Sequence, residues 1–237
     1  MSPSGIFPAI RETGGSDMPQ KRRTVSQPYI TQECTLNSRF SQTAYKRIFE
    51  QVSGSMYLLG IVLRIIGTDE EALAAEKVVD DMITEVSDEL RNEIARLDRL
   101  LEANGLEGAH PKYTHPETYE VQLTSPRAGR FLFLIEQLDT LAHKLDSLWL
   151  TGILTDQQYA NSGYAWQRRV VRLANRIRGI TARAIASARS KGEETQKAVE
   201  KIVSESNVDV ETPIAEDDAG ESRTDEGALE PEEARAA

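Results

Sequence analysis

The chain has 237 residues, of which 39% are hydrophobic, and it contains three histidines and a single cysteine. This composition can bury one sizeable core, and one cysteine excludes an intramolecular disulfide framework. The net charge is −10, but residues 193–237 alone hold fifteen acidic and four basic side chains, so residues 1–192 carry about +1. We therefore predict one domain, residues 29–192, with a tail at each end.

Residues 1–28 are rich in Pro, Gly and Ser and include the basic triplet Lys21, Arg22 and Arg23. We interpret them as a flexible basic arm, whose triplet either contacts phosphate or only solubilises the chain. The arm lacks the continuous apolar stretch of a secretory signal, and the apolar residues 56–66 are too few to cross a membrane. The sequence therefore predicts a cytoplasmic protein with no membrane partner.

Residues 29–37 alternate apolar and polar side chains, as a half-buried strand does. Two helices should follow, at residues 40–52 and 56–66, because the sequence Ser-Gly-Ser at 53–55 favours a break between them. Thr68 and Glu71 form a capping box, which predicts a long helix to about residue 103. Twelve acidic and four basic residues between 69 and 102 give this helix an acidic outer face.

Residues 118–124 alternate in the same way, and the helix expected after Pro126, to about residue 150, is the most core-like segment of the chain. Its Asp139 and Asp146 stand seven residues apart, and we interpret them as solubilising or arginine-pairing groups rather than as a catalytic carboxylate pair. Thr155 and Gln158 form a second capping box, which opens a helix to about residue 188.

Residues 33–39 (ECTLNSR) resemble residues 120–127 (EVQLTSPR) at an offset of 87, and two helical segments follow each. This pattern predicts a diverged strand-helix-helix repeat. We expect the two strands to pair as a short antiparallel ribbon, with Cys34, Leu36, Val121 and Leu123 on its buried face. The predicted fold is mainly α, a helical bundle with a two-stranded β-ribbon of the ribbon-helix-helix kind.

Such a ribbon can enter the major groove of DNA, where Gln and Asn pair with adenine and Thr meets several bases. Glu33 and Glu120 on the same outer face would repel phosphate, although Glu can accept a hydrogen bond from cytosine. The base-reading candidates on that face are Thr35, Asn37, Gln122 and Thr124.

Residues 164–192 include eight basic side chains and no acidic one. At about 100° per residue, five arginines fall within one sector of this helix, opposite an apolar face. Guanidinium groups suit phosphate and carboxylate equally well, so these arginines either hold DNA phosphates or pair with the acidic helix 69–103 or with the acidic, largely disordered tail 193–237. The candidate phosphate-binding residues along the whole chain are Lys21, Arg22, Arg23, Arg39, Arg127, Arg130, Arg168, Arg169, Arg172, Arg176 and Arg183.

The sequence contains none of the motifs that mark phosphate-binding loops, dinucleotide sites, serine hydrolases or zinc proteases. Its three histidines, His110, His115 and His143, have no metal-ligand spacing with Cys34. We therefore predict no catalytic activity, no cofactor, no metal and no small-molecule substrate.

Residues 115–126 (HPETYEVQLTSP), the following Phe- and Leu-rich helix, residues 152–155 (GILT) and the pair Arg168 and Arg169 with Arg176 resemble the AcaB-type proteins of conjugative plasmids and integrating conjugative elements. The resemblance spans about residues 29–190 and implies a transcriptional regulator of conjugation genes with a ribbon-helix-helix DNA-binding element. The helices here are much longer than in minimal ribbon-helix-helix proteins such as Arc.

Residues and resemblance together predict sequence-specific binding of double-stranded DNA at a promoter or operator. We expect a homodimer, because operators are commonly read by two-fold symmetric proteins. The alternative is a helical interaction protein of a conjugative element, whose arginine face binds an acidic protein partner.

Overall fold

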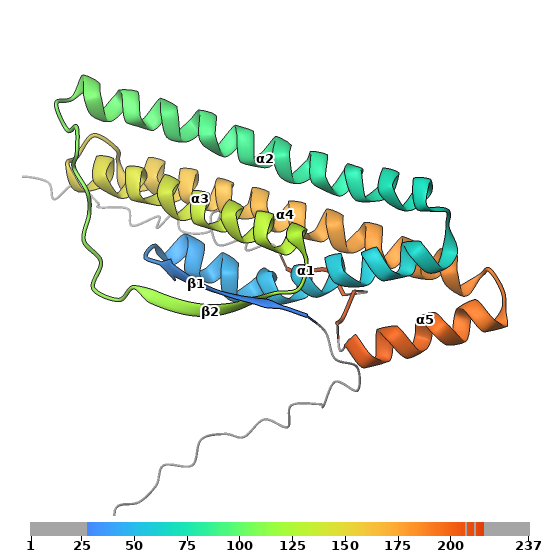
Figure 1. Cartoon of the computed structure of the whole chain (residues 1–237). Coiled ribbons are helices and arrows are strands. Elements are labelled where there is room, and N and C mark those ends of the chain that lie inside the picture. The colour runs from blue at the N-terminus through green and yellow to red at the C-terminus, as the bar shows by residue number, and fades with distance from the viewer. Residues whose placement is uncertain (1–27, 207, 211, 216–237) are drawn as a thin grey trace, which may run out of the picture.

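The computed structural model describes residues 28–206, 208–210 and 212–215. Within these ranges the elements are β1 (Ile30–Leu36), α1 (Arg39–Ile66), α2 (Asp69–Ala103), β2 (Glu117–Leu123), α3 (Pro126–Leu150), α4 (Asp156–Arg189) and α5 (Glu193–Ser206). The long helices form a bundle, and the two strands pair along one side of it (Figure 1). This arrangement confirms the predicted helical bundle with a short antiparallel ribbon.

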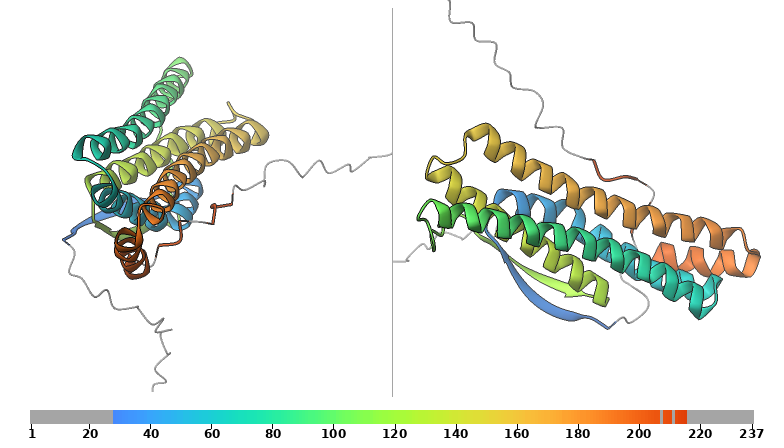
Figure 2. Two further views of the ribbon diagram at one scale, coloured as in Figure 1. Left: turned by 90° about the vertical axis from the view of Figure 1, so that its right-hand side faces the viewer. Right: turned by 90° about the horizontal axis from the view of Figure 1, so that it is seen from above.

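The strand-helix-helix order occurs twice, as β1-α1-α2 and β2-α3-α4. The two strands begin at residues 30 and 117 and the helices after them at residues 39 and 126, an offset of 87 in both cases. The N-caps, Ser38 and Ser125, each accept a hydrogen bond from the N–H three residues further on. Helix α1 packs mainly on α4, and α2 packs mainly on α3, so the two units interlock within one chain (Figure 2).

Helix α1 is continuous, and the break expected at residues 53–55 is absent. Ser55 is fully buried and its hydroxyl donates to the carbonyl of Gln51, while Gly54 lies against the side chain of Val208. These small residues therefore allow close packing rather than end the helix. Among the described helices, α1 is the one long and apolar enough to cross a membrane, and half of its most apolar stretch is buried inside the bundle.

Helix α3 is the packed centre of the molecule, as its apolar periodicity predicted. Its buried side chains meet α1, α2 and α4, and the ribbon covers part of its N-terminal half. Between positions 131 and 138, five apolar residues are completely inaccessible to solvent: Phe131, Leu132, Leu134, Ile135 and Leu138.

Helix α5 extends the fold beyond the domain end expected at residue 192. Val199 is completely buried and packs with Leu58 of α1 and Ile185 of α4, with Ile202 and Val203 around it. These apolar residues lie three or four positions apart, the spacing of a helix with one buried face, although the surrounding sequence is acidic. Residues 216–237 of the expected tail, and the arm residues Lys21, Arg22 and Arg23, lie outside the described residues.

Candidate nucleic-acid interface

The inner face of the ribbon fixes it to the bundle. Residues directly opposite each other in an antiparallel pair point to the same side, and Cys34 is paired with Tyr119. Cys34 is buried, and the Tyr119 ring lies 4.1 Å from the ring of Tyr45 in α1, centroid to centroid. Burial raises the pKa of the Cys34 thiol to about 12, with a contribution from the nearby Glu136. The thiol therefore serves as a packing group.

The outer face of the ribbon is exposed along its whole length. Its cross-strand pairs are Thr31 with Gln122, Glu33 with Glu120 and Thr35 with Thr118. The hydroxyls of Thr35 and Thr118 are 2.9 Å apart. Two predicted base-reading residues, Thr35 and Gln122, are thus on this face, at opposite ends of it. Thr31 and Thr118 share the face and were missed; the antiparallel register is the signal that identifies them.

The other two base-reading candidates lie beyond the strand ends. The side-chain amide of Asn37 donates to a carboxylate oxygen of Asp139 at 3.2 Å, and its main-chain N–H donates to the same carboxylate at 3.1 Å. Asn37 therefore turns toward α3 instead of outward, because the buried carboxylate needs donors. Thr124 is half-buried beside the N-cap of α3.

The two arginines at the start of α3 join this helix to α2. Arg127 donates to Glu76 and to Asp80, both at 3.1 Å, and Arg130 donates to Asp80 at 2.6 Å. Both were expected to contact phosphate, and in this structure both meet carboxylates of the acidic helix. Arg39, in the first turn of α1, is exposed close to the end of β1.

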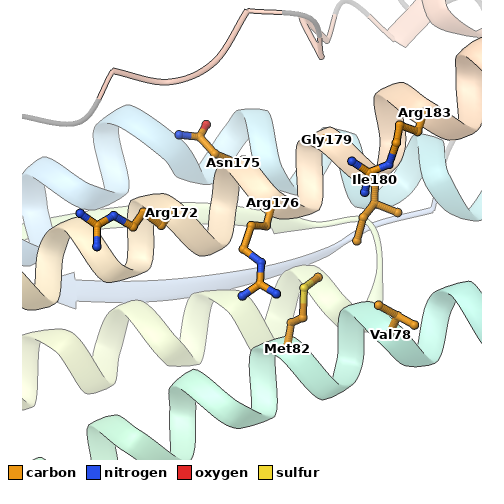
Figure 3. Close-up of a pocket in the computed structure, with 8 residues that line it drawn as sticks. All are labelled: Val78, Met82, Arg172, Asn175, Arg176, Gly179, Ile180 and Arg183. Atoms are coloured by element: carbon orange, nitrogen blue, oxygen red, sulfur yellow. The ribbon is translucent and has the colours of Figure 1, made fainter.

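Four arginines of α4 lie beside α2: Arg169, Arg172, Arg176 and Arg183. Arg169 forms an ion pair with Glu89, one of the two alternatives expected for this face, and its guanidinium is 5.3 Å from the centre of the Trp166 ring. Figure 3 shows the neighbouring open groove between α2 and α4, with a volume of about 670 Å³. The residues that line it are Val78, Met82, Arg172, Asn175, Arg176, Gly179, Ile180 and Arg183.

The ribbon and this groove are on opposite sides of the bundle. In Figure 1 the ribbon follows the lower side and α2 the upper side. In the right-hand view of Figure 2, seen from above, α4 and the ribbon lie on opposite edges of the bundle. A straight duplex lying on the ribbon would therefore not reach the α4 arginines of the same molecule. That these arginines hold phosphates remains a prediction, and it requires a separate segment of nucleic acid.

The described part of the chain contains no group of three or more His, Cys, Asp or Glu side chains that could hold a metal ion. Asp139 and Asp146, which we interpreted as solubilising or arginine-pairing groups, are both buried, so they do not solubilise the helix. Asp146 accepts a hydrogen bond of 2.5 Å from the hydroxyl of Tyr113. Each aspartate thus ties α3 to a segment outside the helix.

Comparison with known proteins gives one informative result. No model of a protein family matches the chain, and no curated protein matches it. The crystal structure of selenomethionine-containing AcaB from uropathogenic E. coli is 38% identical in sequence and similar in structure, with a TM-score of 0.70. The match covers 77% of this chain and 98% of that one. With this identity over nearly all of AcaB, the chain belongs to the AcaB-type proteins.

Proposed function

We propose that this protein is a sequence-specific DNA-binding regulator of conjugative-transfer genes, and that it reads DNA with the outer face of its ribbon. The observation that carries the proposal is the face itself, which presents Thr31, Thr35, Thr118 and Gln122 to solvent in one register. Its inner face is packed on the helices, so these side chains are held on a rigid support. A two-stranded ribbon fits the major groove, and Gln and Thr are base-reading side chains.

The internal repeat bears on how the protein would assemble on DNA. Because β1 and β2 both come from one chain, a single molecule completes a ribbon. A homodimer would then present two ribbons, which suits two half-sites about one helical turn apart. The AcaB-type resemblance, which implies a transcriptional regulator of conjugation genes, supports the same proposal.

Phosphate contacts next to the ribbon would come from the residues that flank β1. The triplet Lys21, Arg22 and Arg23 precedes the strand by a few residues, and Arg39 follows it. Such contacts position a protein on the duplex, whereas base contacts determine the sequence. Glu33 and Glu120, opposite each other at the centre of the face, weaken general attraction to DNA and favour sites where cytosine can donate to them.

The test compares labelled promoter fragments of the element's transfer genes with scrambled fragments at one fixed salt concentration. We expect the promoter to bind at least ~10³-fold more tightly. Gln122→Ala should lower this discrimination by about 1–3 kcal/mol, because a bidentate contact to a base is lost. The matched control is Gln157→Ala, at an exposed glutamine of the first turn of α4. Equal affinity of the unmodified protein for both fragments would refute the proposal.

A second candidate function is a protein-interaction role for the arginine face of α4. The observation that favours it is the groove beside α2, which opens away from the ribbon and is lined by Arg172, Arg176 and Arg183. An acidic protein from the same element would then bind equally well with or without promoter DNA. Promoter preference that depends on Gln122 would decide in favour of the regulator.

A further inference from the structure

We propose that the arginine face of α4, defined as Arg168, Arg172, Arg176 and Arg183, is the docking surface for the chain's own acidic C-terminal segment, residues 216–237. The proposal concerns the side of the bundle away from the ribbon and does not depend on the proposed reading of DNA. Two observations support it: the path of the chain up to residue 215, and the charges of the two surfaces.

After α5 the chain returns along α4. The guanidinium of Arg178 donates to the carbonyl of Asp209 at 2.5 Å. The side chain of Asn175 donates to the carbonyl of Ile214 and accepts from its N–H, both at 2.9 Å. These bonds hold the main chain, so they fix its path independently of its side chains. The chain therefore runs from Arg178 toward the N-terminal end of α4 and ends between Asn175 and Arg47 of α1, whose guanidinium donates to the carbonyl of Ala215.

Asn175 stands at the edge of the arginine face. At about 100° per residue, Arg168 is roughly 20° around the helix from Asn175, Arg172 roughly 60°, Arg183 roughly 80° and Arg176 roughly 100°. In Figure 3, Asn175 points toward the trace of residues 212–215 and Arg176 points toward α2. The face thus begins where the described chain ends and continues around to the groove.

The first acidic residues of the segment are within reach of the nearer arginines. Arg172 and Arg168 lie about 5 and about 10 Å beyond Asn175 along the helix axis, in the direction that the chain is travelling. An extended chain covers about 3.3 Å per residue. Residues 216–218, whose sequence is Glu-Asp-Asp, are therefore long enough to run beside both arginines.

The charges of the two surfaces are complementary. Residues 216–237 contain nine acidic and two basic side chains, whereas residues 164–192 contain eight basic and none acidic. No carboxylate within the described ranges forms an ion pair with Arg168, Arg176 or Arg183. Guanidinium groups bind carboxylates through paired hydrogen bonds, and a tether raises the local concentration of the segment to the millimolar range. A weak attraction between each acidic residue and the arginines is therefore sufficient to hold the segment on the face.

The test uses a fluorescent peptide of residues 216–237 and the whole chain, with fluorescence anisotropy as the readout. In the unmodified chain the segment already occupies the face, so the added peptide should bind weakly. A full-length variant with all nine carboxylates of the segment changed to amides should bind the peptide at least ~10-fold more tightly, as should a chain ending at Ala215. This affinity should fall steeply as salt rises.

The arginines are then tested in the amide variant. Arg168→Ala, Arg176→Ala and Arg183→Ala together should weaken peptide binding at least ~10-fold, because three forked donors are lost. The matched control removes three exposed arginines of α2, Arg91, Arg96 and Arg99, and should change the affinity less than two-fold.

Three results would overturn the proposal. One is equal peptide binding by the unmodified chain and the amide variant. Another is a dimer of the unmodified chain that dissociates in the amide variant, which would make a second copy the occupant. The last is a loss of DNA affinity in the unmodified chain when the three α4 arginines are replaced, which would make the face a DNA surface. The peptide assay contains no DNA, so failure of the ribbon to read a promoter cannot produce the first or second result.

Discussion

The carboxylate of Asp139, in the middle of α3, accepts a hydrogen bond from the main-chain N–H of Ser38, the N-cap of α1, at 2.8 Å. It also accepts from the N–H of Asn37 at 3.1 Å and from the hydroxyl of Ser41 at 2.5 Å. Asp139 is 5% exposed. One side chain of the second strand-helix-helix unit therefore holds the junction between strand and helix in the first, and so positions the ribbon on the bundle.

Replacing this carboxylate should destabilise the protein. Asp139→Asn keeps the shape of the side chain but removes the charge that several donors face, and we expect a loss of about 2 kcal/mol in the free energy of unfolding. Urea unfolding followed by circular dichroism measures it. Asp81→Asn, at an exposed aspartate of α2, is the control and should change stability by less than about 0.5 kcal/mol. A similar small change at Asp139 would show that the bonds contribute little.

Acid should remove the contribution of Asp139. Burial alone would raise the pKa of Asp139, but hydrogen bonds from His143, Ser41 and Ser38 outweigh it and hold the pKa well below its ordinary value of 3.8. The folded state thus binds the proton more weakly than the unfolded state. The stabilisation that Asp139 contributes is fully present above the pKa of this group in the unfolded state. It is lost as the pH falls through the pKa in the folded state.

The stability difference between the unmodified protein and Asp139→Asn should therefore be constant at neutral pH and shrink once the pH falls below about 4. Urea unfolding at a series of pH values measures this difference. The ring of His143 faces the same carboxylate at 3.1 Å, so the series is repeated in a His143→Gln background. A difference that does not change down to the lowest pH at which the protein folds would contradict the assignment.

The sequence predicted the repeated local structure but not the contacts between its parts. Ser38 and Ser125 could be recognised as equivalent N-caps because a cap depends on neighbouring residues. The role of Asp139 could not, because its donors are about a hundred residues away in the chain. Asn37 was misplaced for the same reason. The break expected at Gly54 was wrong because a glycine can serve close packing, here against Val208, as well as a turn.

For the candidate site, too, the sequence predicted local features but not how its parts are arranged in space. Alternation located Thr35 and Gln122 on the outer face, but only the register of the two strands brings Thr31 opposite Gln122. Helical periodicity grouped the α4 arginines correctly on one face, since that property is local. Which way the face points depends on how the two units interlock, and this is decided by packing between distant helices.

Gly163 should tolerate no side chain. A Cβ atom at this position of α4 would lie 2.2 Å from the ring of Phe40, which packs edge-on against Tyr159 and Tyr164. Gly163→Ala should therefore cost about 1–3 kcal/mol of stability, although alanine favours a helix more than glycine does. At Gly179, in the same helix, a Cβ would meet only the end of the Arg183 side chain at 3.9 Å. Gly179→Ala should stabilise the protein by up to about 1 kcal/mol. Thermal unfolding of the two variants gives opposite shifts, and shifts of the same sign would refute the close contact.

Arg127 should contribute to stability rather than to DNA affinity. Its side chain is 20% exposed, its guanidinium lies 3.1 Å from carboxylate oxygens of Glu76 and Asp80, and Glu76 is buried. In Arg127→Ala, Glu76 keeps the exposed Arg64, at 3.3 Å, as its one ion-pair partner among the described residues, so we expect a loss of about 2 kcal/mol in the free energy of unfolding. Glu76→Gln in the same chain should recover part of that loss, because an amide is less costly to leave without a partner than a charge.

The competing expectation is that Arg127 binds phosphate. DNA binding by the Arg127→Ala variant separates a structural role from a phosphate-binding role. If Arg127 is structural, the folded Arg127→Ala protein binds promoter and scrambled fragments as the unmodified protein does, and the salt dependence of binding is unchanged. A phosphate contact would instead weaken binding to both fragments and lower the salt slope by about one. Arg99→Ala, at an exposed arginine of α2, is the control for loss of one positive charge. Weaker DNA binding together with an unchanged free energy of unfolding would assign Arg127 to the DNA interface, since a residue that only joins α3 to α2 cannot give that combination.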